Sequence, residues 1–125
     1  GQCSRTLEGH QSVVRSAVFS PDGQLVLTAS EDFMAKIWSA ESSVCLRTLA
    51  GHRGFVNSAV FSSDGLEVVT ASTDRTVKLW SRHSGECLRT LVEAHESYII
   101  SAVFSRDARK VLTAADDCMA KIWCA

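Results

Sequence analysis

A set of residues recurs along this chain with a period of 42 or 43 residues. Trp38, Trp80 and Trp123 follow this spacing, and the phrase Ser-Ala-Val-Phe-Ser recurs with them at residues 16–20, 58–62 and 101–105. A unit of this length cannot bury its apolar face alone, so successive units must stack and share a core. The sequence therefore predicts one segment over residues 1–125, made of three copies of a single unit at about 1–42, 43–84 and 85–125.

Each unit has the period-two alternation of strands rather than the 3.6-residue period of a helix. In the first unit, residues 14–20 predict a strand buried on both faces, and a Pro-Asp-Gly turn follows at 21–23. Residues 24–30, 33–38 and 44–49 predict three more short strands separated by polar turns. We therefore expect an all-β fold, with four antiparallel strands in each of three units.

The charge and hydropathy of the chain argue against two classes of partner. The 125 residues carry a net charge of −1 and contain no basic tract, so nucleic acid is not expected as a partner. The apolar runs are far shorter than the roughly 20 residues that span a bilayer, so a membrane is not expected either. The first residue is Gly1 rather than Met, which indicates a processed, excised or engineered segment.

The five cysteines follow the repeat instead of a metal-binding spacing. Cys3, Cys45 and Cys87 open the same phrase in successive units, so each lies on a separate unit. Cys118 and Cys124 add no zinc-type spacing. We expect no metal, no cofactor, and buried, reduced thiols in a cytoplasmic protein.

The recurring residues resemble the WD-repeat β-propeller family. The features shared with it are the period, the Gly-His or Ala-His pairs at 9–10, 51–52 and 94–95, the Asp before the third strand, and the Trp that ends it. The family's Asp after this Trp is replaced by Ser39, Ser81 and Cys124. The resemblance implies propeller blades, each holding a hydrogen-bonded network of His, Thr, Asp and Trp. The matching residues are His10, Thr28, Asp32 and Trp38; His52, Thr70, Asp74 and Trp80; and His95, Thr113, Asp117 and Trp123.

The Asp, His and Thr of each set also look like a hydrolase triad. Catalysis needs one activated nucleophile in one cleft. Here the set occurs three times, its hydroxyl is in the middle of a strand, and its fourth member is an indole. We therefore expect a structural network and no enzyme activity.

The resemblance further implies an interaction surface on the rim around the central channel. The matching positions are Val13, Arg15 and Glu31; Phe55, Asn57 and Thr73; and Tyr98, Ile100 and Asp116. Among them Phe55, Tyr98 and Ile100 have the mixture of aromatic and apolar character that is typical of binding hot spots. The alternative is that these side chains pack against the neighbouring blade.

Three blades are too few for a ring, because propellers have roughly four to eight. An open arc would expose two apolar ends and a strand edge. We therefore expect closure by homo-oligomerisation, with two copies giving six blades or three copies giving nine, and the sequence does not favour either. Residues 3–7 carry the fourth-strand phrase and residues 120–124 a third strand, which predicts a seam between these segments of adjacent copies.

Two functions remain open. The first is a non-enzymatic protein-interaction scaffold that binds a protein or peptide at the rim of the self-assembled ring. The second is a purely structural, self-assembling propeller fragment with no separate ligand. One local expectation accompanies both: Ala108 stands where Gly23 and Gly65 end the equivalent turns, so it should adopt a positive φ at some cost.

Overall fold

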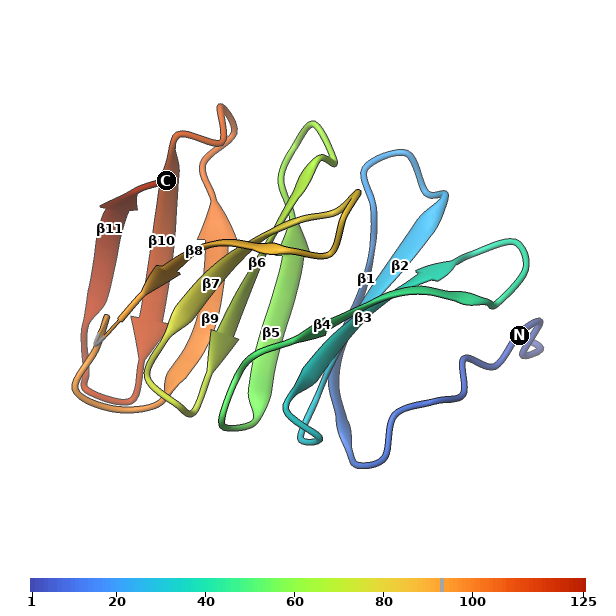
Figure 1. The fold of residues 1–125 in the computed structure, drawn as a ribbon, viewed down its shortest axis with the longest axis horizontal. Coiled ribbons are helices and arrows are strands. Elements are labelled where there is room, and N and C mark those ends of the chain that lie inside the picture. Colours follow the sequence, from blue (N-terminus) through green and yellow to red (C-terminus); the bar gives the residue numbers. More distant parts are fainter. Residues whose placement is uncertain (93) are drawn as a thin grey trace.

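The computed structural model describes residues 1–92 and 94–125, which form three antiparallel sheets and no helix (Figure 1). The first sheet contains β1 (Val14–Phe19), β2 (Leu25–Ser30), β3 (Met34–Ser39) and β4 (Cys45–Ala50). The second contains β5 (Val56–Phe61), β6 (Glu67–Ser72), β7 (Val77–Ser81) and β8 (Cys87–Leu91). The third contains β9 (Ile99–Phe104), β10 (Lys110–Ala115) and β11 (Ala120–Cys124). The expectation of an all-β chain with three blades is confirmed.

The three sheets lie side by side in an open arc, with the two chain termini at opposite ends (Figure 1). Within each sheet, strands adjacent in sequence are adjacent in space, as in a meander. The turns at residues 31–33, 73–76 and 116–119 lie at the same end, the lower edge of Figure 1. We call this end, with the residues that precede β1, β5 and β9, the rim end.

The first strand of every sheet is irregular at an equivalent position. The pairing register shifts between Val14 and Ser16 in β1, and again between Val56 and Ser58 in β5. In β9 it shifts between Ile99 and Ser101. A β-bulge of this kind bends the strand and re-aims the extra side chain. The extra residues are Arg15, Asn57 and Ile100, all three of them predicted rim positions.

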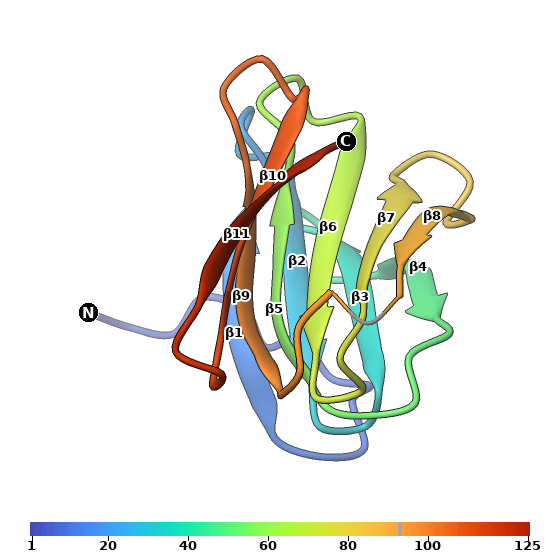
Figure 2. The same ribbon diagram turned by 90° about the vertical axis from the view of Figure 1, so that its left-hand side faces the viewer.

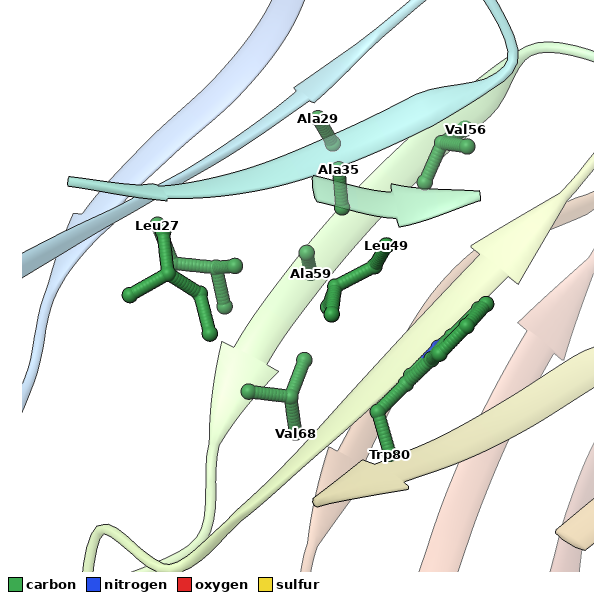
Figure 3. Packing of buried hydrophobic residues seen from close by; sticks show 9 residues of the cluster. Leu27, Ala29, Ala35, Leu49, Val56, Ala59, Val68 and Trp80 are labelled. Atoms are coloured by element: carbon green, nitrogen blue, oxygen red, sulfur yellow. The ribbon is translucent and has the colours of Figure 1, made fainter. Parts of the chain in front are cut away.

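The core consists of two clusters of buried side chains, one between each pair of neighbouring sheets. Between the first two sheets, Leu27 and Leu49 of one sheet meet Val68 and Trp80 of the other (Figure 3). The second cluster includes Ile99, and it joins the second and third sheets in the same way. Each fully buried aliphatic side chain contributes roughly 1.5–3 kcal/mol. The blades are therefore stabilised mainly by their neighbours.

The two end sheets lack this cover on one side. Val14 and Phe19 of β1 are 48% and 68% exposed, and Ile122 of β11 is 70% exposed. The strand equivalent to β1 in the middle sheet, β5, is buried or half-buried throughout. The prediction that residues 14–20 are buried on both faces is therefore wrong for this chain alone, because no sheet packs on the outer side of the first blade.

The third sheet has three strands, as expected from a chain that begins with a fourth-strand phrase and ends on a third strand. The fourth-strand phrase at residues 3–7 is not in a strand, and it extends from the end of the arc opposite to β11 (Figure 1). Figure 2 views the molecule from the side of β11, the last strand of the arc. The cause is the order of the segments in the chain, since the residues suited to complete the third sheet precede the first.

All five cysteines are unpaired and exposed, so the prediction of buried thiols is also wrong. Cys45 and Cys87 begin the outermost strands of their sheets, where no neighbouring blade covers them. Their thiols contact their own strands; Cys45 Sγ donates to the backbone oxygen of Arg47 at 3.4 Å. None of the described residues lies in a helix of the length and hydropathy needed to cross a bilayer.

The turn at Ala108 has the predicted backbone conformation. Its φ is +59°, and Gly23 and Gly65 have +73° in the equivalent turns. In all three turns this residue donates its N–H to the serine three positions earlier, at 2.9 Å. The turn is therefore retained in the third blade although alanine is strained in this region.

Candidate functional site

The twelve predicted network residues come together as three hydrogen-bonded sets, one in each blade. In the second blade, His52 precedes β5, Thr70 lies on β6, and Trp80 lies on β7. His52 Nε2 lies 2.6 Å from Thr70 Oγ1, which also accepts a hydrogen bond from Trp80 Nε1 at 2.9 Å. His52 Nδ1 lies 2.9 Å from a carboxylate oxygen of Asp74. The other blades repeat these distances to within 0.2 Å.

The geometry of the threonine assigns the protons. Thr70 has one hydroxyl proton, and its two possible acceptors are His52 Nε2 at 2.6 Å and the backbone oxygen of Lys78 at 3.5 Å. The longer contact is at the limit of a hydrogen bond, so the proton points to Nε2. His52 is then a neutral imidazole that accepts at Nε2 and donates from Nδ1 to Asp74.

The carboxylate of each set is held in its charged form. Burial raises the pKa of Asp74, but hydrogen bonds from His52, from Thr76 Oγ1 and from the backbone N–H of Arg53 outweigh burial and place the pKa well below its ordinary 3.8. The pKa of Asp32 and of Asp117 is shifted in the same direction by the equivalent histidine and backbone bonds. Each network therefore ties two strands, the turn between them and the segment before the first strand together around a fixed charge.

The same geometry leaves the threonine without a role as a nucleophile. Thr70 is fully buried, and its hydroxyl oxygen is already engaged by an imidazole and an indole. A substrate has no side from which to approach this atom. Among residues 1–92 and 94–125, no group of three His, Cys, Asp or Glu side chains is arranged to hold a metal ion.

Seven of the nine predicted rim residues line one cavity of about 420 Å³ at the rim end. These residues are Arg15, Phe55, Asn57, Thr73, Tyr98, Ile100 and Asp116. Glu31 lies beside the cavity as the ion-pair partner of Arg15, whereas Val13 is exposed and does not line it. All three blades contribute, so the stacking of the sheets creates the cavity.

Most polar groups around the cavity are already held in place. Arg15 Nη2 lies 2.6 Å from Glu31 Oε2, and the guanidinium stands 5.6 Å from the centre of the Phe55 ring. Asn57 Nδ2 donates to the backbone oxygen of Ile99 at 2.9 Å, and Thr73 Oγ1 accepts from the Phe55 N–H at 2.9 Å. The contacts of Arg15 with Phe55 and of Asn57 with Ile99 connect neighbouring blades, and the other two hold side chains within one blade.

Phe33 is a residue of this surface that the sequence reasoning missed. The sequence predicts a strand that begins at this residue, but Phe33 lies in the turn between β2 and β3 with φ +75° and is 43% exposed. Its ring centre is 6.4 Å from that of Phe55, which extends the aromatic surface. The equivalent residues in the other two blades are Arg75 and Cys118. An aromatic residue at only one of these three positions is the sequence signal that could have identified Phe33 as a surface residue.

A second cavity of about 270 Å³ lies between strands β2, β3 and β4 of the first sheet and the turn between β7 and β8 of the second. Its lining residues are Leu25, Ile37, Leu46, Arg47, Arg82 and His83. Arg47 Nε donates to the backbone oxygen of His83 at 2.9 Å, so this lining arginine joins two blades.

Comparison with known proteins shows the same repeat. The family model described as WD domain, G-beta repeat matches at residues 1–39, 43–81 and 85–124. The vegetative incompatibility protein HET-E-1 of Podospora anserina is 52% identical over 40 residues, which is 32% of this chain and 3% of that protein. The nuclear distribution protein PAC1 of Arthroderma otae is 42% identical over 43 residues, or 34% of this chain and 9% of that protein. The chain thus matches a small part of the length of these relatives.

Proposed function

Because this chain belongs to the WD40 repeat family, we propose that it is a non-enzymatic scaffold that binds a protein or peptide segment at its rim end. The observation that carries this proposal is the cavity of about 420 Å³ to which all three blades contribute. Its apolar members Phe55, Tyr98 and Ile100 are 37%, 52% and 45% exposed, so a partner has apolar surface to cover. Full burial of such a side chain contributes roughly 1.5–3 kcal/mol, and covering the part still exposed gives about half of that or less for each, which makes them the expected anchors.

The test is a selection from a displayed library of random 12-residue peptides. Peptides enriched on the wild-type chain are assayed on the double variant Phe55→Ser/Tyr98→Ser. A matched control is Leu66→Ser, since Leu66 is 58% exposed at the opposite end of the β5–β6 hairpin. Scaffold function predicts that the rim variant loses binding and the control retains it. Equal binding to all three proteins would contradict it.

We further propose that copies of the chain associate into a closed ring. The first blade exposes Val14 and Phe19 and the last exposes Ile122, all apolar side chains on faces that the inner blades bury. Trp123 is half-buried, whereas Trp38 and Trp80 are almost fully buried. A further blade on each side would bury these faces and remove the free edge of β11.

The N-terminal segment shares two local side-chain contacts with the fourth strands of the other sheets. Cys3 Sγ donates to the backbone oxygen of Arg5 at 3.2 Å and lies 3.8 Å from Thr6 Oγ1. The same contacts occur within β4, at 3.4 and 3.8 Å, and within β8, at 3.5 Å each. Residues 3–7 thus have two side-chain contacts of a fourth strand without a sheet partner.

A lysine on the third strand of each sheet supports the same seam. Lys36 donates to Thr48 Oγ1 at 3.1 Å and Lys78 to Thr90 Oγ1 at 3.0 Å. Lys121, in the sheet without a fourth strand, donates instead to the backbone oxygen of Ala94 at 3.1 Å. In the first sheet Lys36 lies opposite Thr48. In the ring, Thr6 of the next copy lies opposite Lys121 in the same way. Two copies give six blades and three give nine.

Leu7 allows this seam to be tested without disturbing the single chain. It is half-buried here, but the equivalent Leu49 is fully buried in the core. Leu7→Asp should prevent assembly, because the seam would bury an unpaired charge. Gln2→Asp is the matched control, since the equivalent Val44 is 55% exposed. Assembly of Leu7→Asp as readily as the control would show that the seam lies elsewhere.

The exposed thiols bear on the setting in which the scaffold works. Five unpaired, accessible cysteines would be oxidised in a secretory compartment, where disulfides form and persist. A reducing cytoplasm is the setting that fits them.

A further inference from the structure

We propose that the rim cavity takes an arginine side chain of the bound peptide, with its guanidinium paired to Asp116 and lying against the aromatic rings of Phe55 and Tyr98. The inference rests on the proposed scaffold function and names the chemistry that this function would recognise. The three blades differ in charge at the equivalent positions Glu31, Thr73 and Asp116.

The first blade shows a guanidinium in such a position. Arg15 is the bulge residue of β1, and its guanidinium pairs with Glu31 at 2.6 Å. The same guanidinium stands 5.6 Å from the centre of the Phe55 ring, within the range of a cation–π contact. A carboxylate at the end of the second strand and an aromatic ring therefore suffice to hold a guanidinium at this end of the fold.

The third blade repeats the carboxylate but not the cation. Asp116 occupies the position of Glu31, and Ile100 is the bulge residue in the position of Arg15. The backbone is fixed in the same way in both blades: Asp116 N–H donates to the Tyr98 oxygen at 3.0 Å, as Glu31 N–H donates to the Val13 oxygen at 2.9 Å. The third blade thus has the carboxylate of the ion pair seen in the first blade but not its arginine.

Among the described charged side chains that line the cavity, Asp116 is the one whose charge has no partner of opposite sign. The charge of Arg15 is neutralised by Glu31. Within the described part of the chain, no lysine, arginine or histidine lies within ion-pair distance of the Asp116 carboxylate. A cavity with one free carboxylate and an aromatic, apolar wall is complementary to a cation with a long aliphatic stem.

Arginine fits this wall better than lysine. A guanidinium is planar, can bond a carboxylate through two N–H groups, and stacks on aromatic faces. It is also less strongly hydrated than an ammonium group, so it loses less when Phe55 and Tyr98 enclose it. A lysine side chain would pair with Asp116 as a point charge without these planar contacts.

The experiment uses the random 12-residue peptide library on the full chain and on Asp116→Asn. Asp116 is exposed, and the contact the structure shows for it within the chain is its backbone bond, so the variant should fold normally. The matched control is Glu41→Gln, which removes an exposed carboxylate in the turn between β3 and β4. We expect arginine to be enriched at one peptide position on the wild type and on the control, and not on Asp116→Asn.

A selected peptide then shows how much the pairing of its arginine with Asp116 contributes to binding. Replacing its enriched arginine by citrulline, which is neutral and nearly isosteric, should weaken binding to the wild type roughly 10- to 100-fold, the range of a hydrogen bond to a charged group. The same replacement should cost little on Asp116→Asn, because the partner charge is already absent. Replacement of the arginine by lysine should weaken binding several-fold, which is less than the loss seen with citrulline.

The outcomes separate this inference from the scaffold function. Peptides that require Phe55 and Tyr98 but show no enriched arginine would overturn the inference and leave the scaffold standing. Equal binding with lysine in place of arginine would overturn the preference for a guanidinium. A library that yields no rim-dependent peptide would remove the scaffold function, and the inference with it.

Discussion

Replacing Thr70 by valine tests whether the buried network stabilises the blade to the extent that its geometry indicates. Valine keeps the branched shape of threonine, so the change removes a hydroxyl and little else. It leaves His52 Nε2 without its donor at 2.6 Å and the Trp80 indole N–H without its acceptor at 2.9 Å. Both side chains are buried, so water cannot replace the lost partner.

Each buried group that loses its partner costs about 1–3 kcal/mol, so Thr70→Val should lower the free energy of unfolding by roughly 2–6 kcal/mol. This is a large fraction of the roughly 5–15 kcal/mol that stabilises a typical domain. Thr48→Val is the matched control, because Thr48 is an exposed strand residue whose hydroxyl meets Lys36 Nζ at the surface. A surface change of this kind should stay within about 0.5 kcal/mol.

The assay is urea unfolding followed by tryptophan fluorescence and by circular dichroism, at one fixed protein concentration. Coincident transitions with equal slopes allow the free energies of the two variants to be compared. A loss below about 1 kcal/mol for Thr70→Val, or one no larger than that of Thr48→Val, would refute the assignment of the network as a main stabilising element.

Three further predictions concern the turn at Ala108, the loss of stability at acid pH, and the cysteine thiols. Ala108→Gly should raise the free energy of unfolding by roughly 0.5–1 kcal/mol, because φ is +59° there; a lower melting temperature would contradict this. The folded pKa of Asp74 lies below 3.8, so its contribution is complete above that pH and is lost as the pH falls below it; unfolding measured down to about pH 2 should show a flatter acid limb for Asp74→Asn than for the wild type. All five thiols should react with a disulfide reagent in the native protein, and thiols that react only after denaturant is added would contradict their exposed positions.

The repeat made the strands easy to predict from sequence. The second strand was expected at residues 24–30 and is Leu25–Ser30, and the fourth was expected at 44–49 and is Cys45–Ala50. Alternation and turn residues are local signals that each unit carries three times over, so an error in one copy is visible against the others. The positive φ at Ala108 was predicted by the same comparison.

The errors arose where burial depends on what lies beside a strand. β1 has the pattern of a buried strand, but it is exposed because no blade precedes it. Cys45 has the hydrophobic character of a buried thiol, but its place on the outermost strand exposes it. The bulge that re-aims Arg15 and the positive φ of Phe33 are equally absent from the alternation pattern, since both are set by strand pairing and turn geometry.

Closure of the ring determines whether the rim is an arc or a complete surface, and light scattering at several protein concentrations measures it directly. Self-association through residues 3–7 and β11 predicts a discrete particle with two or three times the chain mass of 13.6 kDa, which Leu7→Asp reduces to a single chain. A wild-type protein that remains folded at 13.6 kDa over the whole concentration range would contradict it.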